Sequence, residues 1–208
     1  MSRVLFVNGS THEYGCTYTA LHEIAKTLEK QGVTTEIVWI GKRPVQDCTS
    51  CGSCRETGRC VFRDDPIDQI LDRLDGYDGR VLGSPVYYAG PTGALCSFMD
   101  RLFYAGNGRM TGKLAAAVVN ARRAGTTAAL DRLYKYFSIC NMVTVWSDYW
   151  NMTFGHTEGQ NLQDAEGLQN MRNLGENMAW MLQNLAAGRA AGVPAPAREP
   201  RMHTNFVR

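Results

Sequence analysis

Residues 3–17 read R-V-L-F-V-N-G-S-T-H-E-Y-G-C-T, an apolar run that leads into a short polar loop. The run from Arg3 to Asn8 has the length and apolar character of a buried strand. Ser10 and Gly15 follow in the loop, and Thr17 lies where a helix is expected to begin. The first N–H groups of a helix lack partners and its dipole is positive there, so an anion such as phosphate can bind. An ordinary strand-to-helix turn, with Thr17 near its cap, explains these residues equally well.

Short apolar runs alternate with longer segments of helical period along the chain, which is typical of a parallel sheet covered by helices on both faces. Two segments, beginning at Leu21 and Leu130, repeat apolar residues at i, i+3, i+4 and i+7. A third helix is expected from Pro91, because proline suits a first helical turn, and a fourth from about Asp164. The expected strands are Arg3 to Asn8, Thr35 to Ile40, Arg80 to Ser84, Leu114 to Asn120 and Met142 to Ser147.

The length of 208 residues is sufficient for one compact domain. We expect this domain to span residues 1–185. Residues 186–208 combine prolines, arginines and small residues without any period, and they predict an extended C-terminal tail.

Composition and charge exclude several functional classes. The chain has 22 Lys and Arg against 20 Asp and Glu, without a basic block, so we expect no nucleic-acid partner. No stretch of about 20 apolar residues occurs and the N-terminal apolar run is too short for a signal peptide, so we expect no membrane association and a cytoplasmic location. Residues 9–17 match neither G-x-G-x-x-G nor G-x-x-x-x-G-K-[ST], which disfavours a dinucleotide-binding fold or a P-loop ATPase.

Four of the seven cysteines follow the spacing Cys48-x2-Cys51-x2-Cys54-x5-Cys60. In a reducing compartment, thiols serve metals or redox chemistry rather than disulfides. Four thiolates this close in sequence can surround one soft metal centre, and the first three repeat the spacing of bacterial ferredoxin cluster loops. Structural zinc favours two pairs separated by a longer loop, so a [4Fe-4S] cluster is the better metal hypothesis. Reduced structural or redox thiols, or a zinc ion, are the alternatives.

Residues 83–91 read G-S-P-V-Y-Y-A-G-P and follow the third expected strand. Open α/β sheets bind ligands at the carboxyl ends of their strands. Tyr87 and Tyr88 can pack there on a planar ring system, while backbone N–H groups reach its polar edge. The alternative interpretation is that both tyrosines are partly buried packing residues.

Three stretches together resemble the NAD(P)H-dependent FMN reductase and iron–sulfur flavoprotein families. The loop 9–17 resembles G-S-P-R-x-x-G-[NS]-T, with Thr11 and His12 in place of Pro and Arg, and Cys16 in place of Asn or Ser. Residues 84–90 resemble S-P-V-Y-x-G, and a helix bearing D-R follows at 100–101, where we expect a structural or subunit-contact pair. The stretch from 48 to 65 resembles the cluster motif of iron–sulfur flavoproteins, and a nearly identical cysteine pattern is typical of family members known only as FMN reductases.

The resemblance implies a fold and a set of cofactor contacts. The implied fold is a flavodoxin-like three-layer α/β sandwich with a parallel five-stranded sheet in the order 2-1-3-4-5, and FMN lies at the carboxyl edge where the order reverses. Arg122 lies in a second ring-contacting loop, where its charge could stabilise reduced flavin or contact NADPH phosphate or solvent. The implied FMN contacts are Ser10, Gly15, Cys16, Thr17, Ser84, Pro85, Val86, Tyr87, Tyr88, Asn120, Arg122 and Gly125. The implied metal ligands are Cys48, Cys51, Cys54 and Cys60.

The function that the resemblance implies is an FMN-dependent oxidoreductase. NAD(P)H delivers hydride to the flavin as a transient cosubstrate, and a quinone, a free flavin, a metal, a nitro compound or another acceptor takes the electrons. No acid–base residue is expected, because the cofactor carries the chemistry. An alternative is an electron carrier that exchanges electrons with ferredoxin through a [4Fe-4S] cluster, and a third is a non-enzymatic flavodoxin-like binding or sensing protein. A cluster in one subunit could serve a flavin in another, so we expect a homodimer or a homotetramer.

Overall fold

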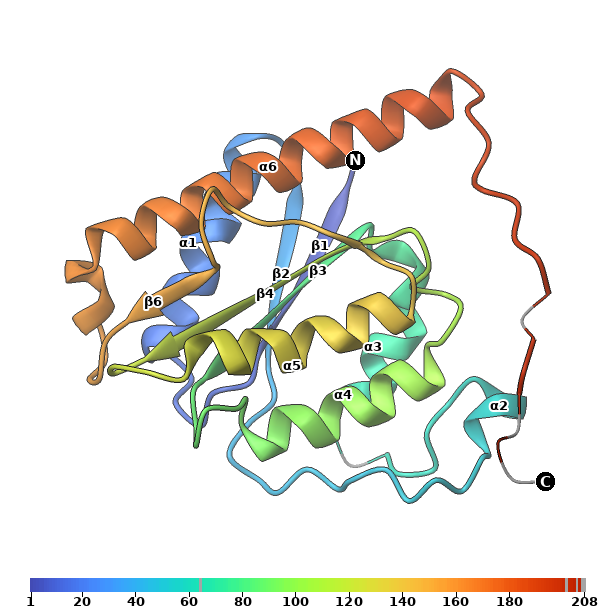
Figure 1. The fold of residues 1–208 in the computed structure, drawn as a ribbon, viewed down its shortest axis with the longest axis horizontal. Helices are drawn as coiled ribbons and strands as arrows, with labels where there is room; N and C mark the ends of the chain where they lie inside the picture. Colours follow the sequence, from blue (N-terminus) through green and yellow to red (C-terminus); the bar gives the residue numbers. More distant parts are fainter. Residues whose placement is uncertain (64, 201, 205, 207–208) are drawn as a thin grey trace.

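The computed structural model describes residues 1–63, 65–200, 202–204 and 206, and its centre is a parallel sheet (Figure 1). Its strands are β1 (Arg3–Asn8), β2 (Thr34–Trp39), β3 (Gly79–Pro85), β4 (Leu114–Ala121) and the short β5 (Val143–Thr144). The strand order is β2-β1-β3-β4-β5, which confirms the predicted order and the flavodoxin-like fold. In the central strand β1, Val4 to Asn8 pair with neighbours on both sides.

The fifth strand differs from the prediction, because it is interrupted. We expect one strand from Met142 to Ser147, but β5 covers only Val143–Thr144, and a further strand, β6 (Met152–Phe154), takes up the pairing with β4. Between them the Ser147 N–H donates to the Asn151 side-chain oxygen at 3.0 Å, and pairing with β4 resumes where the Asn151 carbonyl oxygen accepts from the Val119 N–H at 3.1 Å. The sheet therefore has six strands in five positions.

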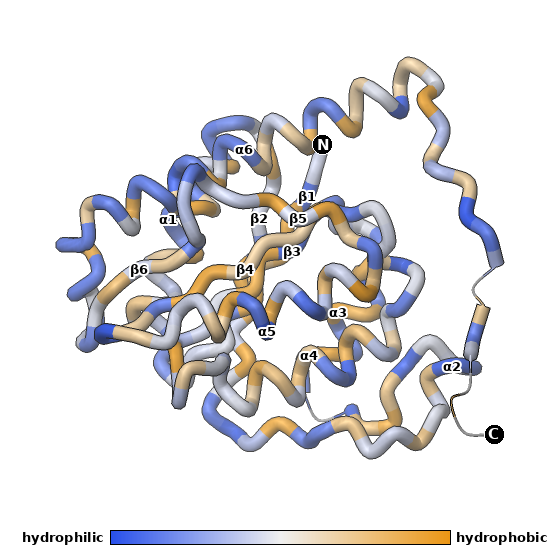
Figure 2. The backbone as a smooth tube through the Cα atoms, viewed as in Figure 1, coloured by the Kyte–Doolittle hydropathy of each residue, from blue (hydrophilic) through white to orange (hydrophobic). Residues whose placement is uncertain are grey.

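Helices cover both faces of this sheet (Figure 1). On one face, α1 (Cys16–Lys30) and α6 (Ala165–Ala190) pack on Val4 and Phe6. On the other face, Leu5 and Val7 pack with residues of three helices. Figure 2 shows the apolar residues gathered along β3 and β4 at the centre of the molecule. The second face carries α3 (Ile67–Arg73), α4 (Gly93–Ala105) and α5 (Thr126–Ile139), and the short elements are α2 (Cys54–Thr57), η1 (Leu74–Gly76) and η2 (Gln160–Gln163).

Two helix boundaries differ from the expected ones. The helix expected from Pro91 begins at Gly93, because the Thr92 hydroxyl accepts a hydrogen bond from the Leu95 N–H and caps the helix. The last helix continues to Ala190, past the expected start of the tail at residue 186, because alanines dominate this stretch and favour helix. The extended part of the tail therefore begins only after α6. In the part of the chain that the structure describes, no helix combines the length and the apolar character needed to cross a bilayer.

Candidate functional site at the carboxyl edge of the sheet

The loop after β1 is shaped by the buried side chain of Asn8. Its Nδ2 donates to the Glu13 carbonyl oxygen at 2.9 Å, and its Oδ1 accepts from the Ser10 N–H at 3.1 Å. The Ser10 hydroxyl in turn accepts from the His12 N–H at 3.1 Å. The loop is thus held in one conformation by its own hydrogen bonds. Sequence reasoning did not assign this role to Asn8, although a polar residue at the end of an apolar strand is a usable signal.

The loop ends at Gly15, the N-cap residue of α1, which has no side chain to satisfy the first helical N–H groups. Ser10 and Thr17 are almost completely buried beside them. A cavity of about 430 Å³ opens in front of this helix end. It brings together six of the residues expected to contact the cofactor, namely Ser10, Gly15, Cys16, Thr17, Pro85 and Asn120, and it is completed by His12, His156, Thr157 and Glu158.

The segment after β6 closes this cavity, and sequence reasoning missed it. The Cys16 thiol donates to the Thr157 carbonyl oxygen at 3.0 Å, so the helix end and the segment are joined. Asn161, fully buried, donates from Nδ2 to the Cys16 carbonyl oxygen at 2.9 Å. Asn120 donates to the Gly155 carbonyl oxygen at 2.9 Å. These contacts join residues up to 145 positions apart, so no local motif could reveal them.

A second loop, after β3, is tied to the first by Ser84 and Thr92. The buried Ser84 hydroxyl accepts from the Thr92 N–H at 3.0 Å and donates to the Pro85 carbonyl oxygen at 2.8 Å. The Thr92 hydroxyl donates to the Gly9 carbonyl oxygen at 2.8 Å. Ser84 was expected to contact the cofactor, but its hydroxyl is engaged within the protein. Its visible role is to fix the position of the two loops.

The tyrosine pair lies in a tight turn at the rim. Tyr87 and Gly90 exchange two backbone hydrogen bonds, of 2.8 and 2.9 Å, around Tyr88 and Ala89. Both central residues have a positive φ, 49° and 59°, which costs a non-glycine residue free energy. The Tyr88 side chain is fully exposed as a result, while Tyr87 is about half exposed, at 48%. The turn therefore presents an aromatic surface to solvent, two and three residues after Pro85, which lines the cavity.

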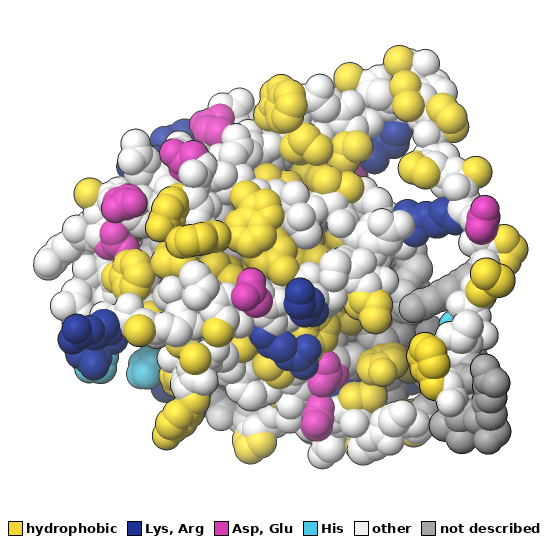
Figure 3. Space-filling model, in the orientation of Figure 1, with side chains coloured by type: hydrophobic (Ala, Val, Ile, Leu, Met, Phe, Trp, Pro, Cys, Tyr) yellow, Lys and Arg dark blue, Asp and Glu magenta, His cyan; other side chains and the backbone are white. Residues whose placement is uncertain are grey.

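A third loop, after β4, packs against this turn through Gly125. A Cβ atom on Gly125 would lie 2.8 Å from the Ala89 Cα and 3.1 Å from Val86, and its φ of 89° also favours glycine. Arg122, in the same loop, is exposed and lines a second hollow of about 580 Å³ together with His156. His156 also lines the first cavity, so the two hollows adjoin. Figure 3 shows basic and histidine side chains gathered at this edge of the molecule.

The four cysteines of the spaced motif form a separate site. Cys48, Cys51, Cys54 and Cys60 all line one cavity of about 310 Å³, and none of them forms a disulfide. Burial raises the pKa of the Cys54 thiol, and electrostatic repulsion from Cys48, Cys51 and Cys60 raises it further. A hydrogen bond from the Ser53 backbone lowers the pKa of Cys51.

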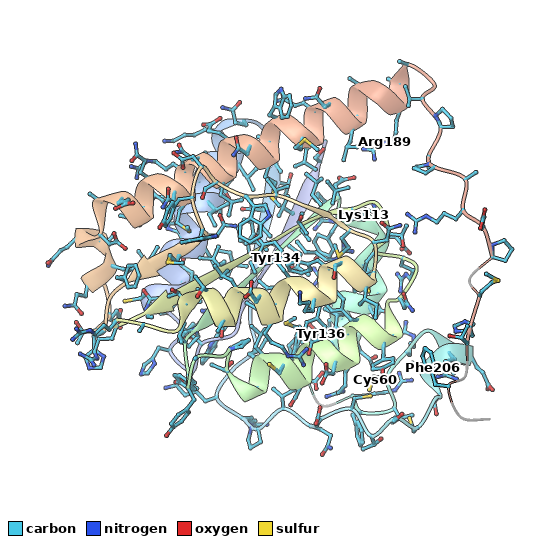
Figure 4. All side chains as sticks on the ribbon, in the orientation of Figure 1. Cys60, Lys113, Tyr134, Tyr136, Arg189 and Phe206 are labelled. Carbon is cyan, nitrogen blue, oxygen red and sulfur yellow. The ribbon has the colours of Figure 1, made fainter. Side chains whose placement is uncertain are left out.

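This arrangement differs from that of a compact single-ion site. Among the described residues, no group of three or more His, Cys, Asp or Glu side chains is arranged to hold one metal ion. The four thiols instead spread around a cavity, which Arg101 and Phe62 also line. Figure 4 labels Cys60, on the loop that leads from α2 toward α3. Four thiols that line one cavity are donors of the kind that soft metal centres take.

Comparisons with known proteins agree with this geometry. A sequence model of the NADPH-dependent FMN reductase family matches residues 2–157. An iron–sulfur flavoprotein of Methanocaldococcus jannaschii is 29% identical over 191 residues, which cover 87% of this chain and 97% of that protein.

Two solved structures share the fold. The apo form of an NADH:FMN oxidoreductase superposes with a TM-score of 0.63 at 17% identity, over 87% of this chain and 90% of that one. A flavodoxin from the domain Archaea superposes with a TM-score of 0.59 at 17% identity, over 88% and 99%.

Proposed function

Because this chain belongs to the NADPH-dependent FMN reductase family, we propose that it binds FMN in the cavity at the end of β1 and reduces it with NAD(P)H. The observation that carries the proposal is the cavity itself, which joins Ser10 of the first loop, Thr17 of the first turn of α1, and Pro85 and Asn120 at the carboxyl ends of β3 and β4. Bound FMN supplies the hydride-accepting chemistry. A quinone, a flavin, a metal or another small acceptor then takes the electrons.

The residues of the chain hold and orient the cofactor. The unpaired N–H groups at the start of α1 and the hydroxyls of Ser10 and Thr17 face the position of the phosphate group. Pro85 and Asn120 line the same cavity, and the exposed Tyr87 and Tyr88 that follow Pro85 offer an aromatic surface for the flavin ring. Val86, Gly125 and Ser84 fix the loops behind these contacts.

Arg122 and Cys16 have more specific roles in this proposal. Arg122 places a positive charge beside the cavity, where it favours the anionic form of reduced flavin. Cys16 occupies the first turn of α1, and its bond to Thr157 holds the closing segment over the phosphate position. Both residues therefore support cofactor binding rather than proton transfer.

The test is a titration of the FMN-free protein with FMN and with riboflavin, which lacks the phosphate group. We expect Ser10→Ala to weaken FMN binding about tenfold, the effect of one hydrogen bond, and to leave riboflavin binding unchanged. Thr11→Ala, in the same loop but outside the cavity lining, serves as the matched control. Rapid loss of flavin absorbance on anaerobic mixing with NADPH supports the reductase. A protein that binds neither compound contradicts the proposal.

A second candidate is favoured by the four thiols around one cavity. In it, Cys48, Cys51, Cys54 and Cys60 hold a [4Fe-4S] cluster, and the protein exchanges electrons with a ferredoxin. Anaerobic purification followed by iron and sulfide analysis tests the cluster, and less than about one iron per chain contradicts it. Reduction of the flavin by ferredoxin and not by NADPH favours the carrier over the reductase. We also propose a homodimer or homotetramer, which light scattering on the eluting protein tests.

A further inference from the structure

Arg101 is a charged residue in an unusual position, the interior of the protein. It lies in the third turn of α4, and its side chain has no exposed surface. A buried charge is costly unless it is paired and hydrogen-bonded. The Arg101 guanidinium meets this requirement, because it is paired with the Asp65 carboxylate and hydrogen-bonded to the Cys60 sulfur. The contacts around Arg101 must therefore compensate its buried charge.

The partners of Arg101 all belong to the loop that carries the four cysteines. Its Nε donates to the Cys60 sulfur at 3.1 Å. Its Nη1 donates to the Gln46 carbonyl oxygen at 3.3 Å, and its Nη2 to the Phe62 carbonyl oxygen at 2.8 Å. Nη1 also forms an ion pair with the Asp65 carboxylate. One planar guanidinium thus joins both ends of the loop and one of its sulfurs.

We propose that Arg101 is the positioning residue of the four-cysteine centre, and that its bond to Cys60 sets the electron affinity of that centre. The inference rests on the proposed [4Fe-4S] cluster and concerns how this chain tunes it. Hydrogen bonds to the cysteine sulfurs and nearby positive charge are among the factors that set cluster potentials. Both favour the reduced state, because one-electron reduction adds a negative charge.

A substitution of Asp65 tests the effect of the Arg101 charge on the cluster potential separately from the positioning of the loop. Its carboxylate partly neutralises Arg101, and its Oδ1 also accepts from the Ile67 N–H at 3.1 Å at the start of α3. Asp65→Asn removes the negative charge but keeps an oxygen for Ile67. The positive charge of Arg101 then acts on Cys60 with less compensation. Arg101→Gln removes that positive charge. The two variants therefore have opposite expected effects on the potential.

The experiment is an EPR-monitored redox titration of the anaerobically purified full chain. We expect the midpoint potential of the cluster to become more negative in Arg101→Gln and more positive in Asp65→Asn. Arg101→Lys keeps the charge but cannot span all four partners, so its potential lies between those of Arg101→Gln and the wild type. Lys30→Gln is the control and should leave the potential unchanged, since Lys30 is exposed at the end of α1 and does not line the four-cysteine cavity. Shifts of the same sign in Arg101→Gln and Asp65→Asn overturn the tuning role.

The positioning role is measured independently by hydrogen exchange of the metal-free full chain. We expect faster exchange of the amides between residues 46 and 65 in Arg101→Gln, with the amides of α1 unchanged. Unchanged exchange in the loop overturns the positioning role. A wild-type protein that holds no iron contradicts the proposed cluster, while the exchange measurement still decides the role of Arg101. If Arg101→Gln does not fold, Arg101→Lys and Asp65→Asn carry both measurements.

Discussion

The two sites of this molecule are built in contrasting ways. The loop proposed to bind the phosphate group, residues 9–17 and called the phosphate-binding loop below, connects a central strand to a helix that packs on the core, and its hydrogen bonds run through the backbone and the buried Asn8. The cysteine loop, residues 46–65, has a four-residue helix among its described residues, and side-chain contacts hold it to the fold: Arg101 bonds to it from α4, and Arg59 and Arg63 pair with carboxylates of α3. The first site is formed where a strand of the sheet meets a helix. The second is formed by the spacing of four cysteines within one loop, which contacts with the rest of the fold hold in place.

The largest expected effect is loss of the metal centre in the cysteine loop, with the phosphate-binding loop unchanged. Cys54→Ser removes one of four thiols, so we expect the cluster to be lost altogether, which iron and sulfide analysis measures. The affinity for FMN should stay unchanged in the same preparation. Cys96→Ser is the control, because Cys96 does not line the four-cysteine cavity. A Cys54→Ser protein that retains full iron shows that the four thiols do not form one centre.

The second-largest expected effect falls on the phosphate-binding loop instead of the cysteine loop. It comes from a substitution that disturbs the packing between this loop and the core. A Cβ atom on Gly9 would lie 2.8 Å from Leu95 and 2.9 Å from the Gly83 carbonyl oxygen, so the loop must move. We expect Gly9→Ala to cost about 3 kcal/mol in the free energy of unfolding and to weaken FMN binding. Urea unfolding and FMN titration measure both. Gly93→Ala meets no atom within 4 Å and should behave like the wild type. Equal stability of the two variants contradicts this account.

A smaller effect tests the segment that closes the phosphate site. Asn161 is buried and donates to the Cys16 carbonyl oxygen and to Thr153. We expect Asn161→Ala to lower the free energy of unfolding by about 2 kcal/mol, because buried groups lose their partners, and to weaken FMN binding more than riboflavin binding. Asn184→Ala, at an exposed position of α6, is the control. If both flavins lose affinity equally, the segment does not act on the phosphate group.

The smallest effect concerns the rim turn. Tyr88 has a φ of 49°, which glycine adopts without strain, so Tyr88→Gly should stabilise the FMN-free protein by up to about 1 kcal/mol. The same change removes the exposed aromatic ring and should weaken the binding of both flavins equally. Thermal unfolding and flavin titration distinguish the two consequences. A loss of stability without a loss of affinity shows that Tyr88 packs within the protein rather than on a ring.

The sequence predicts the local features of both sites, but not the contacts between residues far apart along the chain. The first strand lies at its expected residues, and Ser10, Gly15 and Thr17 meet at the helix end, because a strand-to-helix connection is a local property. The four cysteines likewise share a cavity, as their spacing indicates. The closing residues His156 and Thr157 could not be predicted, because they follow β6, a three-residue strand whose place beside β4 is set by long-range pairing. Arg101 is 41 residues from Cys60, so only the folded chain reveals their contact.

The helix α4 connects these regions. At its N-terminal end, Thr92 bonds to Gly9 and Ser84 beside the phosphate-binding loop, and Arg101 bonds to the cysteine loop about 14 Å further along the axis. A helix is a stiff element of fixed rise, so α4 sets the spacing between the two loops whether or not either of them holds a ligand. The separation of the two proposed sites is therefore a property of the chain itself.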